Sequence, residues 1–288
     1  MQANSQPITT GQLSQVKPNQ WRNLWLISQF ELVRLFFTVR GIISVIAFGM
    51  IWYFILKHLI LQAANYINIP GFKDFVGEAF GQVGLQNILE WPVAEFAVFW
   101  LVSLFLLPLF TLFVTSDQTS SDRSRGTLRF LTLRTSRDSI YFGRFLGQLI
   151  IQMLLLSAVM LATFAMSIWN DHSQWQLALY TGFIMAVNLF IVILPFTALM
   201  ALCSAIARSS RLATMLAFIG VGAIIALTGY LTYKWPIFES LKYLIPGLQI
   251  GDLIQSNHWE TLQHAWLPII QAIVLLALGR TVIQRSSL

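Results

Sequence analysis

Residues 117–144 hold the densest group of chemically active side chains in the chain: DQTSSDRSRGTLRFLTLRTSRDSIYFGR. This segment contains three acidic and six basic residues, which are nine of the thirty charged residues in the whole sequence. All six basic residues are arginines, whose guanidinium groups present several fixed hydrogen-bond donors to carboxylates and carbonyl oxygens. The sequence on both sides is almost entirely apolar. This pattern favours binding to a partner or to an anionic surface rather than covalent catalysis.

Motifs for covalent and metal chemistry are missing from the sequence. It contains no G-x-S-x-G and no H-E-x-x-H, and its four histidines lack the tight spacing of zinc ligands. No metal site is therefore predicted. The phosphate-binding loop G-x-x-x-x-G-K-[ST] is also absent, so the chain does not bind ATP in that way. The middle portions of the apolar segments carry no ionisable side chain, which disfavours an intramembrane enzyme.

The composition identifies the solvent that the chain needs. Hydrophobic residues make up 56% and charged residues only 10%, and the mean hydropathy is +0.68. Soluble domains carry roughly 25% charged residues. The single cysteine, Cys203, excludes an internal disulfide framework. We therefore expect an all-α integral membrane protein.

Six apolar segments are long enough to cross a hydrocarbon layer about 30 Å thick, which requires about 20 residues of helix. These predicted spans cover residues 41–62, 94–115, 145–169, 177–207, 212–233 and 265–283. Residues 1–18 are polar and are predicted to form a disordered cytoplasmic tail. The spans and their loops make residues 38–288 a single six-helix transmembrane domain.

The distribution of lysine and arginine predicts the orientation. With six spans, fourteen of the eighteen basic residues fall on the side of both termini and four on the other side. The positive-inside rule therefore places both termini in the cytoplasm. The basic charge balance needs no nucleic acid to explain it, and inner-leaflet lipid is the expected anion.

Residues 19–37 precede the first span without forming one. Apolar residues recur there at helical spacing, but charged residues interrupt them too often for a crossing segment. We expect an amphipathic helix lying in the inner interface, with its tryptophans at headgroup depth. The residues assigned to this interfacial element are Trp21, Trp25, Glu31, Arg34 and Arg40.

The uncharged polar side chains within the spans have two possible roles. Gln148 and Gln152 lie one helical turn apart in the third span, and Asn188 lies in the fourth. They are candidates for lining a transport pathway. The alternative is that they hold neighbouring helices together by hydrogen bonds.

Within the charged segment, a short helix is predicted over residues 122–133, capped by Thr119 or Ser120. Its leucines would lie on one side and its arginines on the other: Leu128 and Leu131 against Arg125 and Arg129. Ser136 and Asp138 would cap a second helix that continues into the third span. The result is a basic helical knuckle on the cytoplasmic side. The alternative is a loop that contacts only lipid headgroups.

The order of residues in the knuckle resembles the permease subunits of type-2 ABC transporters, the ABC-2 family. These carry E-R-x-x-G-T-L-x-x-L between their second and third spans, then an S-R pair and G-K. Here the chain reads DRSRGTLRFL, then SR and GR. The residues that match are Asp122, Arg123, Gly126, Thr127, Leu128, Leu131, Ser136, Arg137, Gly143 and Arg144. Asp122 replaces the usual Glu and Arg144 the usual Lys, so both charges are kept.

The stretch FELVRLFFTVRG before the first span is similar to the interfacial helix of the same family. The resemblance covers nearly the whole chain. Within the family, the chain looks most like permeases of nitrous-oxide-reductase maturation and gliding motility.

The resemblance implies a coupling helix that binds a separate ATP-binding subunit. The implied partner-binding residues are Asp122, Arg123, Arg125, Gly126, Thr127, Leu128, Arg129, Leu131, Ser136 and Arg137. ATP and Mg²⁺ would then bind in the partner, present in two copies beside two copies of this chain. The resemblance also implies export across a bacterial inner membrane. The alternative function is a membrane anchor that docks a cytoplasmic complex and transports nothing.

Overall fold

The computed structural model describes residues 20–67, 69, 71, 88, 91–256 and 258–285, and the predicted tail over 1–18 lies outside them. The described residues form helices and turns, with no strand among them. Six helical segments in these ranges are long and apolar enough to cross a membrane: Val39–Ile67, Ala94–Val114, Arg137–Asn170, His172–Ile206, Ser210–Lys234 and Trp259–Arg285. The predicted all-α membrane fold with six spans is therefore confirmed.

Up to the charged segment, the described residues form one helix followed by the first two spans. Its elements are α1 (Gln20–Phe37), α2 (Val39–Phe54), the π-helical turn η1 (Ile55–Ile60), α3 (Leu61–Ile67) and α6 (Ala94–Val114). The Thr38 side chain separates α1 from α2, because its hydroxyl accepts a hydrogen bond from the amide of Gly41 (3.1 Å) and so caps α2. The interfacial position of α1 stays a prediction.

The rest of the chain contains the charged segment, the two longest of the described helices and the return to the end of the bundle that carries this segment. Its elements are α7 (Ser120–Ser124), α8 (Thr127–Thr132), α9 (Arg137–Asn170), η3 (His172–Gln174), α10 (Trp175–Ile206), α11 (Ser210–Lys234), η4 (Pro236–Leu244), α12 (Ile250–Gln255), η5 (His258–His264) and α13 (Trp266–Arg285). Ser136 and Ser209 cap α9 and α11 by accepting hydrogen bonds from the amides of Ser139 (3.1 Å) and Leu212 (3.2 Å).

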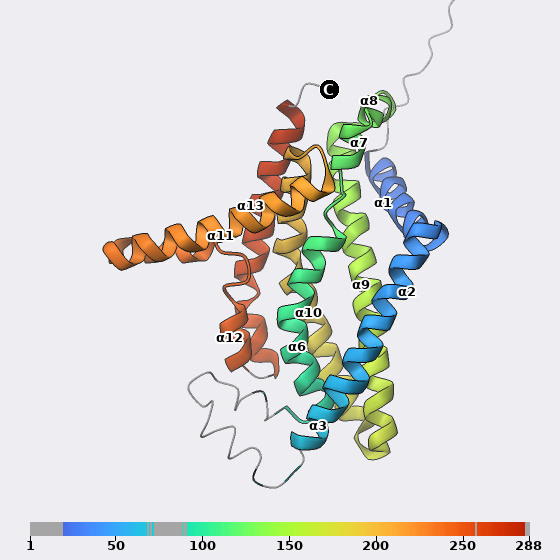
Figure 1. The fold of residues 1–288 in the computed structure, drawn as a ribbon, viewed down its shortest axis with the longest axis vertical. Coiled ribbons are helices and arrows are strands. Elements are labelled where there is room, and N and C mark those ends of the chain that lie inside the picture. Colours follow the sequence, from blue (N-terminus) through green and yellow to red (C-terminus); the bar gives the residue numbers. More distant parts are fainter. Residues whose placement is uncertain are drawn as a thin grey trace, which may run out of the picture.

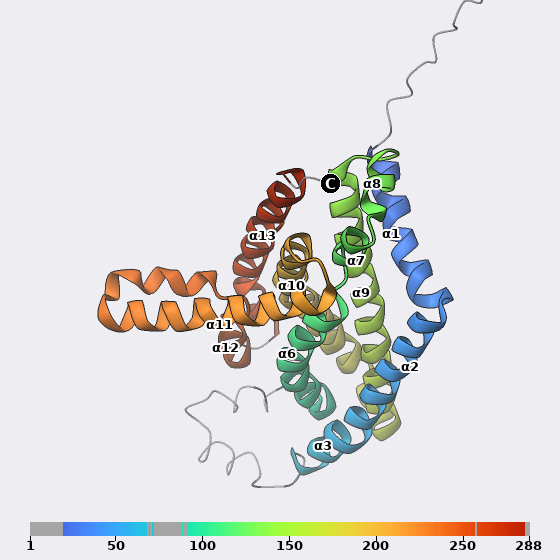
Figure 2. The ribbon, with the colours of Figure 1, turned by 45° about the horizontal axis from the view of Figure 1, so that its top comes forward.

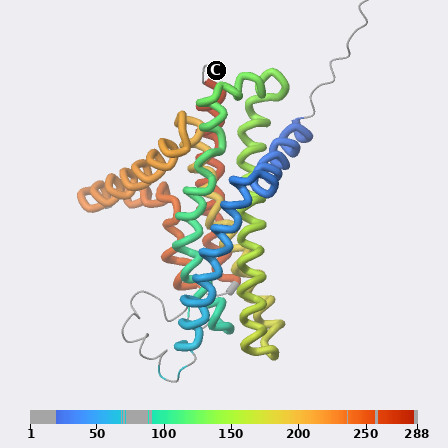
Figure 3. Tube along the Cα trace, turned by 45° about the vertical axis from the view of Figure 1, so that its right-hand side comes forward, coloured from blue at the N-terminus to red at the C-terminus, as the bar shows by residue number. Residues whose placement is uncertain are grey.

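The helices α6, α9, α10 and α13 run side by side, and α2 and α3 lie along one flank of this bundle (Figures 1 and 3). The short helices α7 and α8 lie at one end of the bundle with the end of α13, and α3 lies at the opposite end. The charged segment is therefore displayed at an end of the bundle, where it can meet a partner outside the hydrocarbon.

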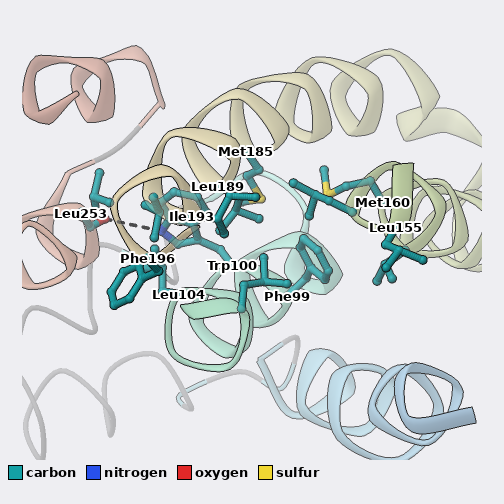
Figure 4. Packing of buried hydrophobic residues seen from close by; sticks show 14 of the residues in the cluster. Phe99, Trp100, Leu104, Leu155, Met160, Met185, Leu189, Ile193, Phe196 and Leu253 are labelled. Carbon is teal, nitrogen blue, oxygen red and sulfur yellow. Dashed lines mark hydrogen bonds between the residues drawn. The ribbon is translucent and has the colours of Figure 1, made fainter. Parts of the chain in front are cut away.

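The core lies between α6 and α10, whose side chains interlock at the centre of the bundle (Figure 4). Phe99, Trp100 and Leu104 of α6 are fully buried, as are Met185 and Leu189 of α10. The indole N–H of Trp100 donates to the backbone oxygen of Leu253 in α12 (3.4 Å). The Trp100 side chain therefore helps to fix these helices while its N–H remains hydrogen-bonded.

The fifth predicted span has the expected length but an unexpected direction. The helix α11 leaves the bundle near the end that carries α7 and runs outward, across the direction of the other long helices (Figures 1 and 2). It packs against η4, which folds back along it. Its outer face is apolar and exposed, as at Met215, Ile219 and Tyr230.

Two glycines allow α1 to lie directly on the first turns of α9. A Cβ atom added at Gly143 would lie 2.9 Å from both the Cβ of Ile27 and the backbone oxygen of Leu24. One added at Gly147 would lie 2.9 Å from the Cβ of Glu31. The buried hydroxyl of Ser28 donates to the backbone oxygen of Gly143 (2.8 Å). Small residues that let helix backbones approach are typical of membrane helix pairs.

We expect Gly143→Ala and Gly147→Ala to destabilise the protein by about 1–3 kcal/mol relative to Gly222→Ala, because each added methyl group overpacks the contact with α1. The control at Gly222 gains the same helix propensity, but an added Cβ there meets nothing within 4 Å. Thermal unfolding of the purified protein in mild detergent measures the difference. Equal stability of all three variants would contradict the close contact.

Candidate functional site

The charged segment forms two short helices rather than the single helix predicted over residues 122–133. Gly126 separates α7 from α8 and has φ +70°, a left-handed conformation that glycine adopts without steric cost. The Thr127 hydroxyl donates to the backbone oxygen of Asp122 (3.2 Å) and lies 3.1 Å from its carboxylate. The single-helix prediction is therefore wrong, and the glycine bends the knuckle back on itself.

Asp117, rather than Thr119 or Ser120, supplies the side chain that caps α7. Its carboxylate accepts hydrogen bonds from the amide of Ser121 (3.0 Å) and the hydroxyl of Ser120 (3.1 Å), and it pairs with Arg34 of α1 (3.2 Å). Thr119 occupies the capping position without a side-chain cap. Partial burial raises the pKa of Asp117, but hydrogen bonds from the two serines and the nearby Arg34 outweigh it and lower the pKa below its ordinary value.

Arg144 is the central charge of the site. It lies in the second turn of α9, and only 5% of its surface is exposed. One guanidinium nitrogen pairs with Glu31 of α1, and the other pairs with Asp122 of α7. The planar fork of arginine is suited to holding two acceptors at once. One side chain thus joins a span, the predicted interfacial helix and the knuckle.

Glu31 is almost completely enclosed, with 3% of its surface exposed. Its carboxylate accepts a further hydrogen bond from the side-chain amide of Gln148 (3.2 Å), and Arg34 lies 3.9 Å away. Burial raises the pKa of Glu31 above its ordinary value and outweighs the lowering by Arg144 and Arg34. The charge of Glu31 is therefore costly and depends on the guanidinium beside it.

A chain of hydrogen bonds continues from this ion pair towards the middle of the bundle. The side-chain amide of Gln152 donates to the backbone oxygen of Gln148 (3.3 Å) and to the hydroxyl of Thr197 on α10 (3.0 Å). Its oxygen accepts a hydrogen bond from the hydroxyl of Thr111 on α6 (2.7 Å). Gln118 donates to the backbone oxygen of Thr197 (3.1 Å). Three spans are thereby linked to the knuckle.

The three candidate pathway residues all have internal partners. Gln148 and Gln152 bind neighbouring helices, and Asn188 donates to the backbone oxygen of Ile184 in its own helix (2.9 Å). A cavity beside Gln152 has a volume of about 10 Å³, which is room for about one water molecule. The contacts of Gln148 and Gln152 favour the interhelical role, whereas the partner of Asn188 lies in its own helix, and the pathway role stays a prediction.

Two arginines of the knuckle bind the ends of other helices. Arg123 donates to the backbone oxygen of Ala205 at the end of α10 (2.6 Å). Arg137 donates to the backbone oxygens of Gln284 (2.8 Å) and Ile283 (3.2 Å) at the end of α13. Cations favour the carbonyl end of a helix, where backbone oxygens lack partners. Both arginines therefore have internal roles that the sequence did not indicate.

The exposed tip of the knuckle combines apolar and cationic side chains. Phe130 and Leu133 are 72% and 83% exposed, and Arg125, Arg129 and Arg134 are exposed beside them. We call these five residues the tip. The predicted anchor Leu128 instead points into the protein, with 6% exposed, and Leu131 is half-buried.

Phe130 and Leu133 are the residues that the sequence-based prediction missed. With Leu128 inside, a helical repeat of 3.6 residues carries positions two and five further along to the opposite side. This helical repeat was the signal in the sequence that could have identified Phe130 and Leu133. Using it requires knowing that Leu128 faces inward, and only the packing of α8 shows this. Among the other predicted residues, Gly126 forms the bend, and Thr127 and Ser136 form local hydrogen bonds.

The predicted interfacial residues divide into two sets. Trp21, Trp25 and Arg40 are exposed, as a helix lying among headgroups requires. Glu31 and Arg34 instead tie α1 to the knuckle. In the part of the chain that the structure describes, no three His, Cys, Asp or Glu residues come together as metal ligands.

The fold and the site define a class of protein: a multi-pass membrane protein whose charged knuckle is fixed to its spans. Residues 8–284 match the model of the family described as ABC-2 family transporter protein. Because the match covers nearly the whole chain, the protein belongs to this family and is a transmembrane subunit of an ABC transporter. No curated protein matches it.

We expect Arg144→Met to lower the free energy of unfolding by about 3–5 kcal/mol, because Glu31 would be left buried without its cation. The loss is largest at neutral pH and becomes smaller as the pH falls, since protonation removes the unpaired charge. Thermal unfolding in detergent between pH 5 and pH 8 measures this dependence. The exposed Arg125→Met is the matched control and leaves stability nearly unchanged.

We also expect Asp117→Ala to destabilise the protein by about 1–2 kcal/mol at pH 7, because α7 loses its cap and Arg34 its partner. The lowered pKa means that Asp117 contributes stability above the pKa of the unfolded chain, and that this contribution disappears as the pH falls through the folded pKa. The difference from wild type should therefore shrink at pH 3. A difference independent of pH would contradict the role of the ionised carboxylate.

Proposed function

We propose that this chain is the permease subunit of an ATP-driven exporter and that separate ATP-binding subunits drive it by gripping the tip. The single observation that carries the proposal is the tip itself, where Phe130 and Leu133 are exposed beside three arginines. Aromatic and arginine side chains dominate the binding energy of protein interfaces. The partner surface that fits is an apolar groove with an acidic rim.

The contacts of the knuckle provide the mechanical coupling between the ATP-binding subunit and the spans that ATP-driven transport requires. Arg144 fixes α7 to α9 and α1, and Arg123 fixes α7 to the end of α10. A displacement of the tip is therefore passed to three helices rather than absorbed by a loop. The absence of the phosphate-binding loop from this sequence supports placing ATP and Mg²⁺ in the partner.

The complete assembly that we propose has two copies of this chain and two ATP-binding subunits in a bacterial inner membrane. Both termini lie in the cytoplasm, which the excess of basic residues on their side supports. The resemblance favours export as the direction of transport. It also favours a placement among permeases of nitrous-oxide-reductase maturation and gliding motility. Transport would proceed by alternating access between rigid helix bundles.

A membrane anchor for a cytoplasmic complex is the second candidate function. The tip favours it equally, because an exposed apolar and basic surface serves any acidic partner. The two functions differ in the partner: the permease requires a subunit that hydrolyses ATP, and the anchor does not.

We expect Phe130→Ala, and the double variant Arg125→Glu with Arg129→Glu, each to weaken binding of the ATP-binding subunit about tenfold or more. The measurements are the amount of this subunit that copurifies in mild detergent and its rate of ATP hydrolysis. Trp169→Ala is the control, because Trp169 is 85% exposed at the far end of α9.

If the wild-type protein purifies alone, or with a partner that hydrolyses no ATP, the permease function fails. A partner without ATPase activity that still requires Phe130 would establish the anchor instead. Equal losses in the control would show that the variants act through misfolding and would remove the support from the tip.

A further inference from the structure

The junction between α10 and α11, which we call the 207–211 turn, consists of residues 207–209 and the first two residues of α11. The end of α10 that leads into it is hydrogen-bonded to the knuckle. The hydroxyl oxygen of Ser204, which is fully buried, accepts hydrogen bonds from the amides of Thr119 (2.8 Å) and Ser120 (3.0 Å). The start of α7 and the end of α10 thus share one hydrogen-bonded joint. The two elements lie side by side in both ribbon views (Figures 1 and 2).

Arg123 strengthens this joint, and two further arginines lie in the adjacent turn. Its guanidinium donates to the backbone oxygens of Ala205 (2.6 Å) and Ile206 (3.3 Å). The next basic residues, Arg208 and Arg211, are exposed. Neither forms an ion pair with an acidic residue in the described ranges.

The acidic side chains at this end of the bundle are all engaged by other arginines. Glu31 and Asp122 hold Arg144, Asp117 holds Arg34, and Asp138 holds Arg280. These are the four acidic residues on the predicted cytoplasmic side. Five of the exposed arginines, those of the tip and of the 207–211 turn, therefore have no acidic partner among the described residues: Arg125, Arg129, Arg134, Arg208 and Arg211.

We propose that the 207–211 turn is a second contact for the ATP-binding subunit, in which Arg208 and Arg211 pair with carboxylates on the rim of the groove that receives Phe130 and Leu133. The contact rests on the proposed function, because its partner is the subunit that grips the tip. It enlarges the interface from one loop to two and assigns a role to residues outside the family motif.

Rigidity distinguishes this contact from simple attraction to lipid headgroups. The hydrogen bonds of Ser204 and Arg123 hold the turn at a fixed position relative to the tip. Attraction to mobile headgroups requires no such register, whereas a protein groove with fixed carboxylates does. A partner bound to both loops would hold α9 through the tip and α10 with α11 through the turn.

The test uses the full-length chain in nanodiscs and the ATP-binding subunit that copurifies with it. We expect Arg208→Gln and Arg211→Gln each to raise the Kd for that subunit about two- to fivefold at low salt, the range of an exposed ion pair. The difference should fade in high salt because ions screen such pairs. Arg40→Gln is the matched control, since Arg40 is exposed at the start of α2, away from the knuckle.

Unchanged binding by both variants, with Phe130→Ala still weakening it, would overturn the second contact and leave the proposed function intact. A loss that appears only in nanodiscs with anionic lipid would assign the arginines to headgroups and would also overturn it. A wild-type chain that binds no ATP-binding subunit would overturn both proposals together.

Discussion

The pairing of the buried Arg144 guanidinium is the interaction on which the knuckle end of this protein depends. The guanidinium lies between Glu31 and Asp122, which belong to helices far apart in the sequence, and both carboxylates need it. A charge enclosed to this degree is tolerated only when it is paired and hydrogen-bonded. The arrangement fixes which faces of α1, α7 and α9 meet. Apolar packing alone would leave these faces free to slide in a membrane, where lipid tails compete equally with side chains.

The polar contacts divide the molecule into a braced end and a freer side. Around the knuckle, the Arg144 side chain connects α7 to α9, the Ser204 and Arg123 side chains connect α7 to α10, and the Arg137 side chain connects α9 to α13. The hydrogen bonds of Gln152 extend this bracing towards the interior. By contrast, α11 leaves the bundle and exposes a wide apolar face. A displacement imposed at the braced end would therefore be passed to all the helices joined there rather than to one helix alone.

The sequence was sufficient for the membrane class, the six spans and the position of the knuckle, because length, hydropathy and charge are local properties. It also assigned Glu31 to the predicted interfacial helix and matched Asp122 and Arg144 to the motif of the knuckle. It could not show that they meet, since their pairing depends on how α1 seats against Gly143 and Gly147. The orientation of α8 was equally hidden, so Leu128 was chosen as an anchor in place of Phe130. The outward course of α11 depends on its packing against η4, which composition does not reveal.

The distance along the chain between Glu31 and its partner has a consequence for biosynthesis. Arg144 follows Glu31 by 113 residues, so at a synthesis rate of 5–20 residues per second it emerges roughly 10 s later. During that interval α1 exists without the cation that permits its carboxylate to be buried. The helix α1 is therefore made well before its seat on α9 exists, and a position at the membrane surface would hold it while the first two spans are inserted. Its amphipathic character, with exposed tryptophans, suits this waiting position.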